Sequence, residues 1–402
     1  MTKGTRAGNG LLVAASILSG AFATAAILIS QRRIGNDGFA PLAQLWTVWA
    51  LLTASVTFGT QQWTVRQLVI GTPLGRVVRE ILRRSVVPTI VATVCAVQFI
   101  DELFDGRLWF APLVGAVVLG TAITGFGRGL AAMMPEPNHL ATLIVSENLI
   151  RLAVLVPLVT TDATIEWYGL GLVAGFAPYL AVQRTMRESG EGTPSGSGGI
   201  LLPAAAGGVG YATMFGAPLL LGLSAAPSAD VSSLFLVLAI ARVPFVLMLG
   251  LLPRLVVDFE RRVSSGDLPE VGEVLRPLSL CVAAAAAVGV LAWLFSEATF
   301  GKLLGTNDQF GGEVYALVGF ASILALAALV LTMLSLALDM RHTVVMVWSV
   351  PLVLMIVGAN RAWFSTASAI AWSVAALEAF VVTAFALRIS TRLRRPSDSF
   401  VG

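Results

Sequence analysis

The sequence predicts an all-α integral membrane protein with about twelve transmembrane helices in two six-helix halves. Hydrophobic residues make up 56% and charged residues 12% of the chain, whereas about a quarter of the residues in soluble proteins are charged. Apolar segments of roughly 20 residues recur, which is the length that crosses a hydrocarbon core of about 30 Å as a helix. A stretch rich in Gly, Ser and Pro divides these segments six and six, as expected after duplication of a six-helix unit.

The first half contains six apolar segments, which we expect to be helical because a helix satisfies its own backbone polar groups in lipid. They are Leu11–Ile29, Phe39–Gly59, Val86–Ile100, Trp109–Phe126, Leu140–Thr160 and Trp167–Val182. The first segment could also be the apolar core of a cleaved signal peptide, with small residues at Ala21 to Ala26. Its length and the spans that follow favour an uncleaved helix.

The second half contains Ile200–Leu223, Val231–Leu252, Leu278–Phe295, Val314–Leu338, Thr343–Val357 and Phe364–Leu387. The first of these carries Pro203, Gly207, Gly208 and Pro218, which predict a bent or interrupted helix. Close packing through small residues is the alternative explanation for the glycines. Prolines near both ends of the segment favour the bend.

Four parts of the chain follow from this division. Residues 1–183 form an N-terminal six-helix bundle, 184–199 a cytoplasmic linker, 200–390 a C-terminal six-helix bundle and 391–402 a cytoplasmic tail. The linker includes SGEGTPSGSGG, a composition typical of flexible connections.

The distribution of basic residues predicts that both termini are cytoplasmic. With that orientation, 19 of the 26 Lys and Arg residues lie on the cytoplasmic side and five outside, as the positive-inside rule requires. Arginine outnumbers lysine 24 to 2, which suggests a GC-rich bacterial genome. We therefore expect a multi-pass protein of the bacterial cytoplasmic (inner) membrane.

The predicted topology can be tested at Ser195 in the linker. A single cysteine at this position, with Cys95 and Cys281 replaced by alanine, should react with a membrane-impermeant maleimide only after the cells are opened. Labelling of intact cells would contradict the topology.

Several classes of function are disfavoured by composition. The two cysteines lie in separate apolar runs, and His139 and His342 are far apart, so no metal site or cofactor is predicted. The pI of about 9.2 reflects arginines at the ends of apolar segments and predicts no nucleic-acid binding.

The external connections are short, and the longest, Ser296 to Glu313, is too small for a catalytic domain. No catalytic residues are assigned, and the protein is not expected to be an enzyme. The acidic residues Asp101, Glu102 and Asp105 could belong to a catalytic or metal site of a membrane glycosyltransferase or polymerase. Their simpler interpretation is an external loop with few basic residues.

Charges inside the hydrocarbon are the most informative residues, because an ionised side chain there costs several kcal/mol, on the order of 2.5 or more, without a partner or water. Glu147 and Arg151 are four residues apart and share one helix face, so they can pair. This pair could order the helices or could line a cavity, and the sequence leaves both open.

Arg242 and Glu378 lie within the eighth and twelfth segments. Arginine retains its proton, so Arg242 must face a partner on another helix, an anionic ligand or a water-filled cavity, and we favour the cavity. Glu378 could pair with Arg242, bind a coupling proton or cation, or extend towards the membrane edge.

The cytoplasmic stretch from Gln61 to Arg84 carries five arginines interleaved with aliphatic residues. This pattern predicts an amphipathic interfacial segment that contacts anionic membrane lipids.

Degenerate patterns along the chain resemble the multidrug/oligosaccharidyl-lipid/polysaccharide exporter superfamily, particularly its polysaccharide biosynthesis and O-antigen type flippases. They are IGNDGFAPLAQLW at Ile34–Trp46, RGLAAMM and SENLIRL between Arg128 and Leu152, ARVP and LLPRL between Ala241 and Leu255, and FGKLLG at Phe300–Gly305. The first helix has no interior charge, unlike that of peptidoglycan-precursor flippases, so lipid II is a less favoured cargo.

The resemblance implies two pseudo-symmetric six-helix bundles around a central cavity that opens alternately to each side. It implies export of a polyprenyl-(pyro)phosphate-linked saccharide for cell-envelope synthesis, with glycan-synthesis enzymes as possible partners. Arg128, Arg151 and Arg242 are the expected substrate-binding residues, and Glu147 and Glu378 the candidates for ion or proton coupling. A cation-coupled multidrug exporter of the same superfamily is the main alternative.

Overall fold

The computed structural model describes residues 3–69, 71–134, 138–182, 216–224, 226–244, 259, 262, 268–296, 310–360 and 366–394. Within these ranges the chain forms helices and no strands, which confirms the predicted all-α class. Seven of these helices are long and apolar enough to cross a membrane. The chain separates into two compact units, residues 1–240 and 241–402.

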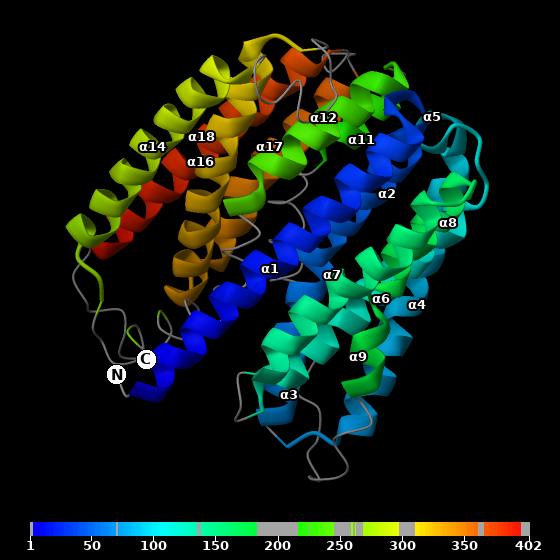
Figure 1. The fold of residues 1–402 in the computed structure, drawn as a ribbon. Helices are drawn as coiled ribbons and strands as arrows, with labels where there is room; N and C mark the ends of the chain where they lie inside the picture. The colour runs from blue at the N-terminus through cyan, green and yellow to red at the C-terminus, as the bar shows by residue number, and fades with distance from the viewer. Residues whose placement is uncertain are drawn as a thin grey trace. The chain divides into compact units, whose positions relative to one another are not determined.

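The first unit is built around one buried helix, α6 (Phe110–Ala132). The surrounding helices are α1 (Lys3–Ile34), α2 (Asn36–Leu52), α3 (Phe58–Val69), α4 (Leu74–Gln98), α5 (Ile100–Phe104), α7 (Asn138–Val159), α8 (Ile165–Ala174) and α9 (Ala177–Val182). Helix α6 packs against α2, α3, α4, α8 and α9, and α1 runs beside α7 (Figure 1).

The second predicted span is longer than the sequence suggested. Helix α2 continues through a single π-helical stretch, Thr53–Thr57, into α3, so the chain remains helical to Val69. The Thr57 hydroxyl donates to the Thr121 carbonyl of α6 at 2.9 Å. Gly125 lies directly against the Thr57 carbonyl, where a Cβ atom would overlap it. This close approach uses small residues to bring two membrane helices together.

Two other predicted boundaries differ. The third predicted span starts earlier than expected, because the arginine-rich stretch from Gln61 to Arg84 includes the end of α3 and the first turns of α4, with Gly71 between them at a φ of +81°. Contact of this stretch with anionic lipids stays a prediction. The sixth predicted span is divided into α8 and α9 at Gly175 and Phe176.

The second unit contains α14 (Val271–Leu294), α16 (Gly312–Ala337), α17 (Arg341–Asn360) and α18 (Ala367–Leu393). Helix α16 packs against α14, α17 and α18. It is largely buried, whereas only Ala285 and Gly289 of α14 are buried.

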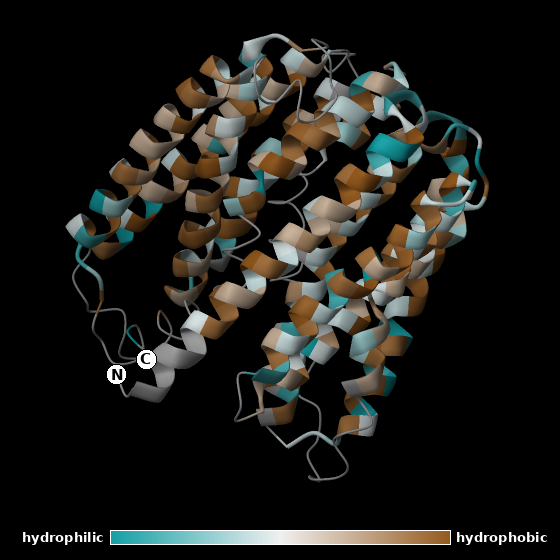
Figure 2. Cartoon of the chain, in the orientation of Figure 1, coloured by the Kyte–Doolittle hydropathy of each residue, from teal (hydrophilic) through white to brown (hydrophobic). Residues whose placement is uncertain are grey.

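The two units repeat one pattern. The fourth predicted span is the central helix of each unit, α6 in the first and α16 in the second. Each packs against the largely exposed third span of the same unit, which is α4 in the first and α14 in the second. Hydrophobic residues extend along α14 and α16, while hydrophilic residues gather at the start of α2 and around α5 (Figure 2). Exposed aliphatic residues on α4 and α14, such as Val87 and Leu280, suit contact with lipid tails.

The start of the second half packs with the first unit. Helices α11 (Ala217–Leu223) and α12 (Ser228–Ala241) lie against the beginning of α2, where the Ser232 hydroxyl donates to the Asn36 carbonyl at 2.6 Å. Pro218 lies in the first turn of α11. Pro203, Gly207, Gly208 and the 184–199 linker lie outside the described residues, so the bend and the domain boundaries stay predictions.

Candidate functional site

A buried ionic cluster joins α6, α7 and α9 in the first unit. Glu147 is at its centre, 1% exposed, and accepts three hydrogen bonds. One carboxylate oxygen accepts from Arg151 at 2.7 Å, and the other accepts from Arg128 at 2.9 Å and from the Tyr179 hydroxyl at 2.6 Å. The predicted pairing of Glu147 with Arg151 is therefore present, and a second arginine shares the carboxylate.

Arg151 is fully buried, and polar, aromatic and backbone groups contact its guanidinium. Besides Glu147, it donates to the Asn148 side chain at 2.7 Å and the Leu172 carbonyl at 3.1 Å. Its guanidinium carbon lies 4.4 Å from the ring centroid of Trp49, within the range of a cation–π interaction. Gly175 contacts this guanidinium so closely that a Cβ atom there would overlap it. These contacts hold the Arg151 side chain in the protein interior, and its expected contact with substrate stays a prediction.

Arg128 is the accessible member of the cluster. Its side chain is 21% exposed, compared with 0% for Arg151 and 1% for Glu147. It lies four residues before the end of α6, so it is roughly 6 Å from the predicted cytoplasmic end. Two arginines and one glutamate give the cluster a net charge of +1. Arg128 is the charged residue of the cluster whose side chain is accessible.

The sequence indicated only part of this cluster. The i, i+4 spacing predicted the Glu147–Arg151 pair, and the family resemblance named Arg128 as a substrate-binding residue. Neither indicated that Arg128 shares the Glu147 carboxylate, and Tyr179 was not identified. Tyr179 is fully buried, and its hydroxyl accepts from Arg128 Nε at 3.1 Å while it donates to Glu147. The sequence signal for Tyr179 was weak: it is a tyrosine in the apolar span Trp167–Val182, close to Arg184.

Arg242 and Glu378 come together in the second unit. Arg242 lies just after the end of α12 and is 2% exposed, while Glu378 on α18 is fully buried. The two charges interact electrostatically. Of the alternatives for Glu378, this arrangement favours pairing with Arg242 over extension to the membrane edge.

The acidic residues of the predicted external loop lie elsewhere, on α5 and at its end. Asp101, Glu102 and Asp105 line a pocket that none of the cluster residues touches. In the described part of the chain, no group of three His, Cys, Asp or Glu residues is placed to hold a metal ion.

Comparison with known proteins gives matches in structure only. No family model matches the chain, and no curated protein matches it in sequence. An inward-facing multidrug resistance MATE family transporter of the MOP superfamily matches with a TM-score of 0.62 and 12% identity, over 95% of both chains. An outward-facing structure of such a transporter gives 0.61 and 12%, over 97% of both chains.

A MOP superfamily transporter from Pyrococcus furiosus also matches, with a TM-score of 0.62 and 11% identity over 97% of this chain and 96% of that one. It is described as having a binding pocket of reversed polarity that suggests a different function. The protein therefore has the fold of MATE transporters over nearly its whole length.

Proposed function

We propose that this protein is an alternating-access transporter that moves a polyprenyl-(pyro)phosphate-linked saccharide from the cytoplasmic to the outer leaflet. Support for the transport class comes from the shared fold with transporters captured in inward-facing and outward-facing conformations. The anionic cargo is supported by the net positive Arg128–Glu147–Arg151–Tyr179 cluster, which is the observation that carries the proposal.

Arg128 is assigned the contact with the phosphate group, because its side chain is partly exposed near the predicted cytoplasmic end of α6. Guanidinium groups form strong charge-assisted hydrogen bonds to phosphate oxygens. Glu147 and Tyr179 fix the orientation of Arg128, and Arg151 fixes Glu147. Arg242 is a second candidate contact, in the C-terminal unit.

Coupling through Glu147 is less favoured by the same geometry. Its carboxylate already accepts from two arginines and a tyrosine, and a proton or sodium ion would have to displace these donors. Glu378 remains as a candidate coupling residue.

The alternative is a multidrug exporter, which the names of the neighbours favour. Cationic drugs would require uncompensated carboxylates along the transport path. The buried cluster of the first unit instead has an excess of positive charge, so we rank the anionic cargo first.

The membrane potential supplies a testable driving force. A pyrophosphate-linked lipid carries about two negative charges, so outward movement from a negative interior would release roughly 4 to 5 kcal/mol per 100 mV. In proteoliposomes with a labelled polyprenyl-pyrophosphate saccharide, flipping should accelerate under a potassium-diffusion potential of the correct sign and slow under the opposite sign.

Empty liposomes and an Arg128→Ala variant serve as controls. If the rate of flipping does not depend on the sign of the potential but does depend on a pH or sodium gradient, then ion coupling, and not the membrane potential, drives transport. Transport of ethidium without transport of the saccharide would overturn the proposed cargo.

A further inference from the structure

One side of α4 is exposed along its whole length and changes from basic to aliphatic. Its exposed residues recur every three or four positions and are Arg76, Arg79, Arg83, Val87, Ile90 and Val94. This spacing keeps the side chains on one face of an α-helix. The opposite face packs against α6 through the buried residues Val77 and Ile81. The exposed face therefore has arginines in its first turns and an aliphatic strip after them.

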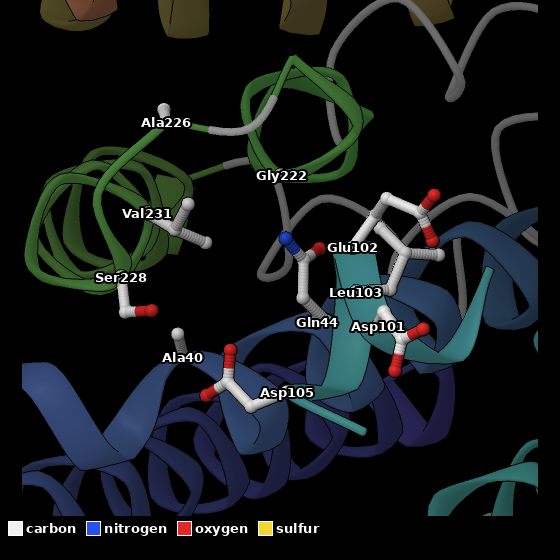
Figure 3. Close-up of a pocket in the computed structure, with 10 residues that line it drawn as sticks. All are labelled: Ala40, Gln44, Asp101, Glu102, Leu103, Asp105, Gly222, Ala226, Ser228 and Val231. Atoms are coloured by element: carbon white, nitrogen blue, oxygen red, sulfur yellow. The ribbon is translucent and has the colours of Figure 1, made fainter. Parts of the chain in front are cut away.

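The apolar part of α4 is shorter than the membrane. Over residues 86–98 the helix rises about 20 Å, whereas the hydrocarbon core is about 30 Å thick. The exposed acidic residues Asp101 and Glu102 follow on α5, where they line a pocket (Figure 3), and they place this end of the helix outside the hydrocarbon. The turns that carry Arg79 and Arg83 therefore span the remaining depth of the core.

In the part of the chain that the structure describes, Arg79 and Arg83 form no ion pair. Glu80, the only acidic residue of α4, accepts from Arg84 at 2.7 Å. The guanidinium carbon of Arg84 also lies 5.5 Å from the ring centroid of Trp63, so this arginine is held against the protein.

An arginine at the depth of the hydrocarbon requires an anion or water. Its long side chain can extend along the helix to the level of the lipid phosphates. Arg79 and Arg83 are four positions apart, which places them one helical turn, about 6 Å, from each other. The exposed face of α4 thus presents two positive charges close to where lipid phosphates lie.

We propose that this face binds an anionic phospholipid, with Arg79 and Arg83 on its phosphate group and Val87 and Ile90 along an acyl chain. The predicted topology assigns this lipid to the cytoplasmic leaflet. Guanidinium groups form charge-assisted hydrogen bonds with phosphate oxygens, and a lipid with a net negative charge complements both arginines. The face lies apart from the buried cluster of α6, α7 and α9, so the proposal does not depend on the proposed cargo.

Quenching of a fluorophore at position 87 by brominated lipids measures which lipid occupies the face. The full chain carries Val87→Cys as its single cysteine, with Cys95 and Cys281 replaced by alanine. It is labelled and reconstituted into vesicles of equal parts phosphatidylglycerol and phosphatidylcholine, in which one or the other lipid has brominated acyl chains.

Phosphatidylglycerol should quench this fluorophore more strongly than phosphatidylcholine. Each arginine near a membrane surface contributes about a fivefold preference for an anionic lipid, so two should raise the ratio of the association constants to between about fivefold and 25-fold. Equal quenching by the two lipids would overturn the proposal.

Ala284 on α14 is the matched control position. It is exposed and lies as far from the start of α14 as Val87 lies from the start of α4. Helix α14 carries one arginine and one glutamate, whereas α4 carries four arginines and one glutamate. A fluorophore at Ala284→Cys should show a ratio near one. The same enrichment at both positions would assign the preference to the general surface charge, and the proposal would be wrong.

Three variants locate the charges that bind the lipid. Arg79→Gln/Arg83→Gln should lower the ratio at position 87 to near one. Arg79→Lys/Arg83→Lys keeps both charges and should retain most of the preference, which general damage to the fold would not allow. Arg388→Gln removes an exposed arginine near the end of α18 and should change nothing. An unchanged ratio in the Gln double variant, or an equal loss in Arg388→Gln, would contradict the assignment.

The pyrophosphate of a lipid-linked saccharide has the same chemistry as the phospholipid phosphate. Addition of polyprenyl-pyrophosphate saccharide in an amount equimolar to the protein separates the two. Unchanged quenching by phosphatidylglycerol supports a site for membrane lipid, whereas relief of the quenching would assign this face to the transport path and overturn the proposal.

Discussion

Glu147→Gln should destabilise the protein by about 3 to 5 kcal/mol, the usual cost of removing one partner from a buried ion pair. The substitution keeps the size of the side chain but leaves Arg128 and Arg151 close together, with no anion between them. Reversible unfolding in mixed micelles, with the midpoint and slope compared to the unmodified chain, measures the effect.

The matched control is Glu166→Gln, which removes the same charge from a partly exposed pair with Arg107. Exposed pairs contribute about 0 to 1 kcal/mol. The double variant Glu147→Gln/Arg151→Met should lose less stability than Glu147→Gln alone, because it removes the fully buried one of the two arginines that Glu147→Gln leaves without a carboxylate. Equal small effects of Glu147→Gln and Glu166→Gln would contradict the structural role of the cluster.

Arg242→Ala should reduce saccharide export by about tenfold to a hundredfold while protein abundance stays normal, if Arg242 contacts the anionic cargo. A charge-assisted contact contributes roughly 1.5 to 3 kcal/mol, which corresponds to a loss of about tenfold to a hundredfold. Export in cells and flipping in proteoliposomes should fall together. Arg33→Ala provides a control, because Arg33 pairs with Asp162 at an exposed position.

The interaction of Arg242 with Glu378 offers a second explanation that the same experiment separates. Loss of the protein from the membrane in Arg242→Ala, rescued by Arg242→Ala/Glu378→Ala, would assign Arg242 a structural role. Unchanged export would remove Arg242 from the transport path.

Much of the fold could be predicted from the sequence because the membrane restricts it. Residues 314–338 must form a helix in lipid, and α16 spans Gly312–Ala337. Boundaries were less predictable where polar segments continue a helix. Arg76 to Arg84 belong to the first turns of α4, although the sequence placed them before the third span, in an amphipathic interfacial segment.

The sequence by itself determined the membrane class, the repeated apolar segments and the pairing of Glu147 with Arg151, because hydrophobic length and helical periodicity are local properties. Only the tertiary structure brought Arg128 of α6 and Tyr179 of α9 to the same carboxylate, that of Glu147. These two residues are 19 and 32 positions from Glu147 along the chain. The packing of α11 against α2 likewise placed Pro218 beside Gln44, 174 residues apart. Such contacts depend on how helices pack across the unit, which no local pattern specifies.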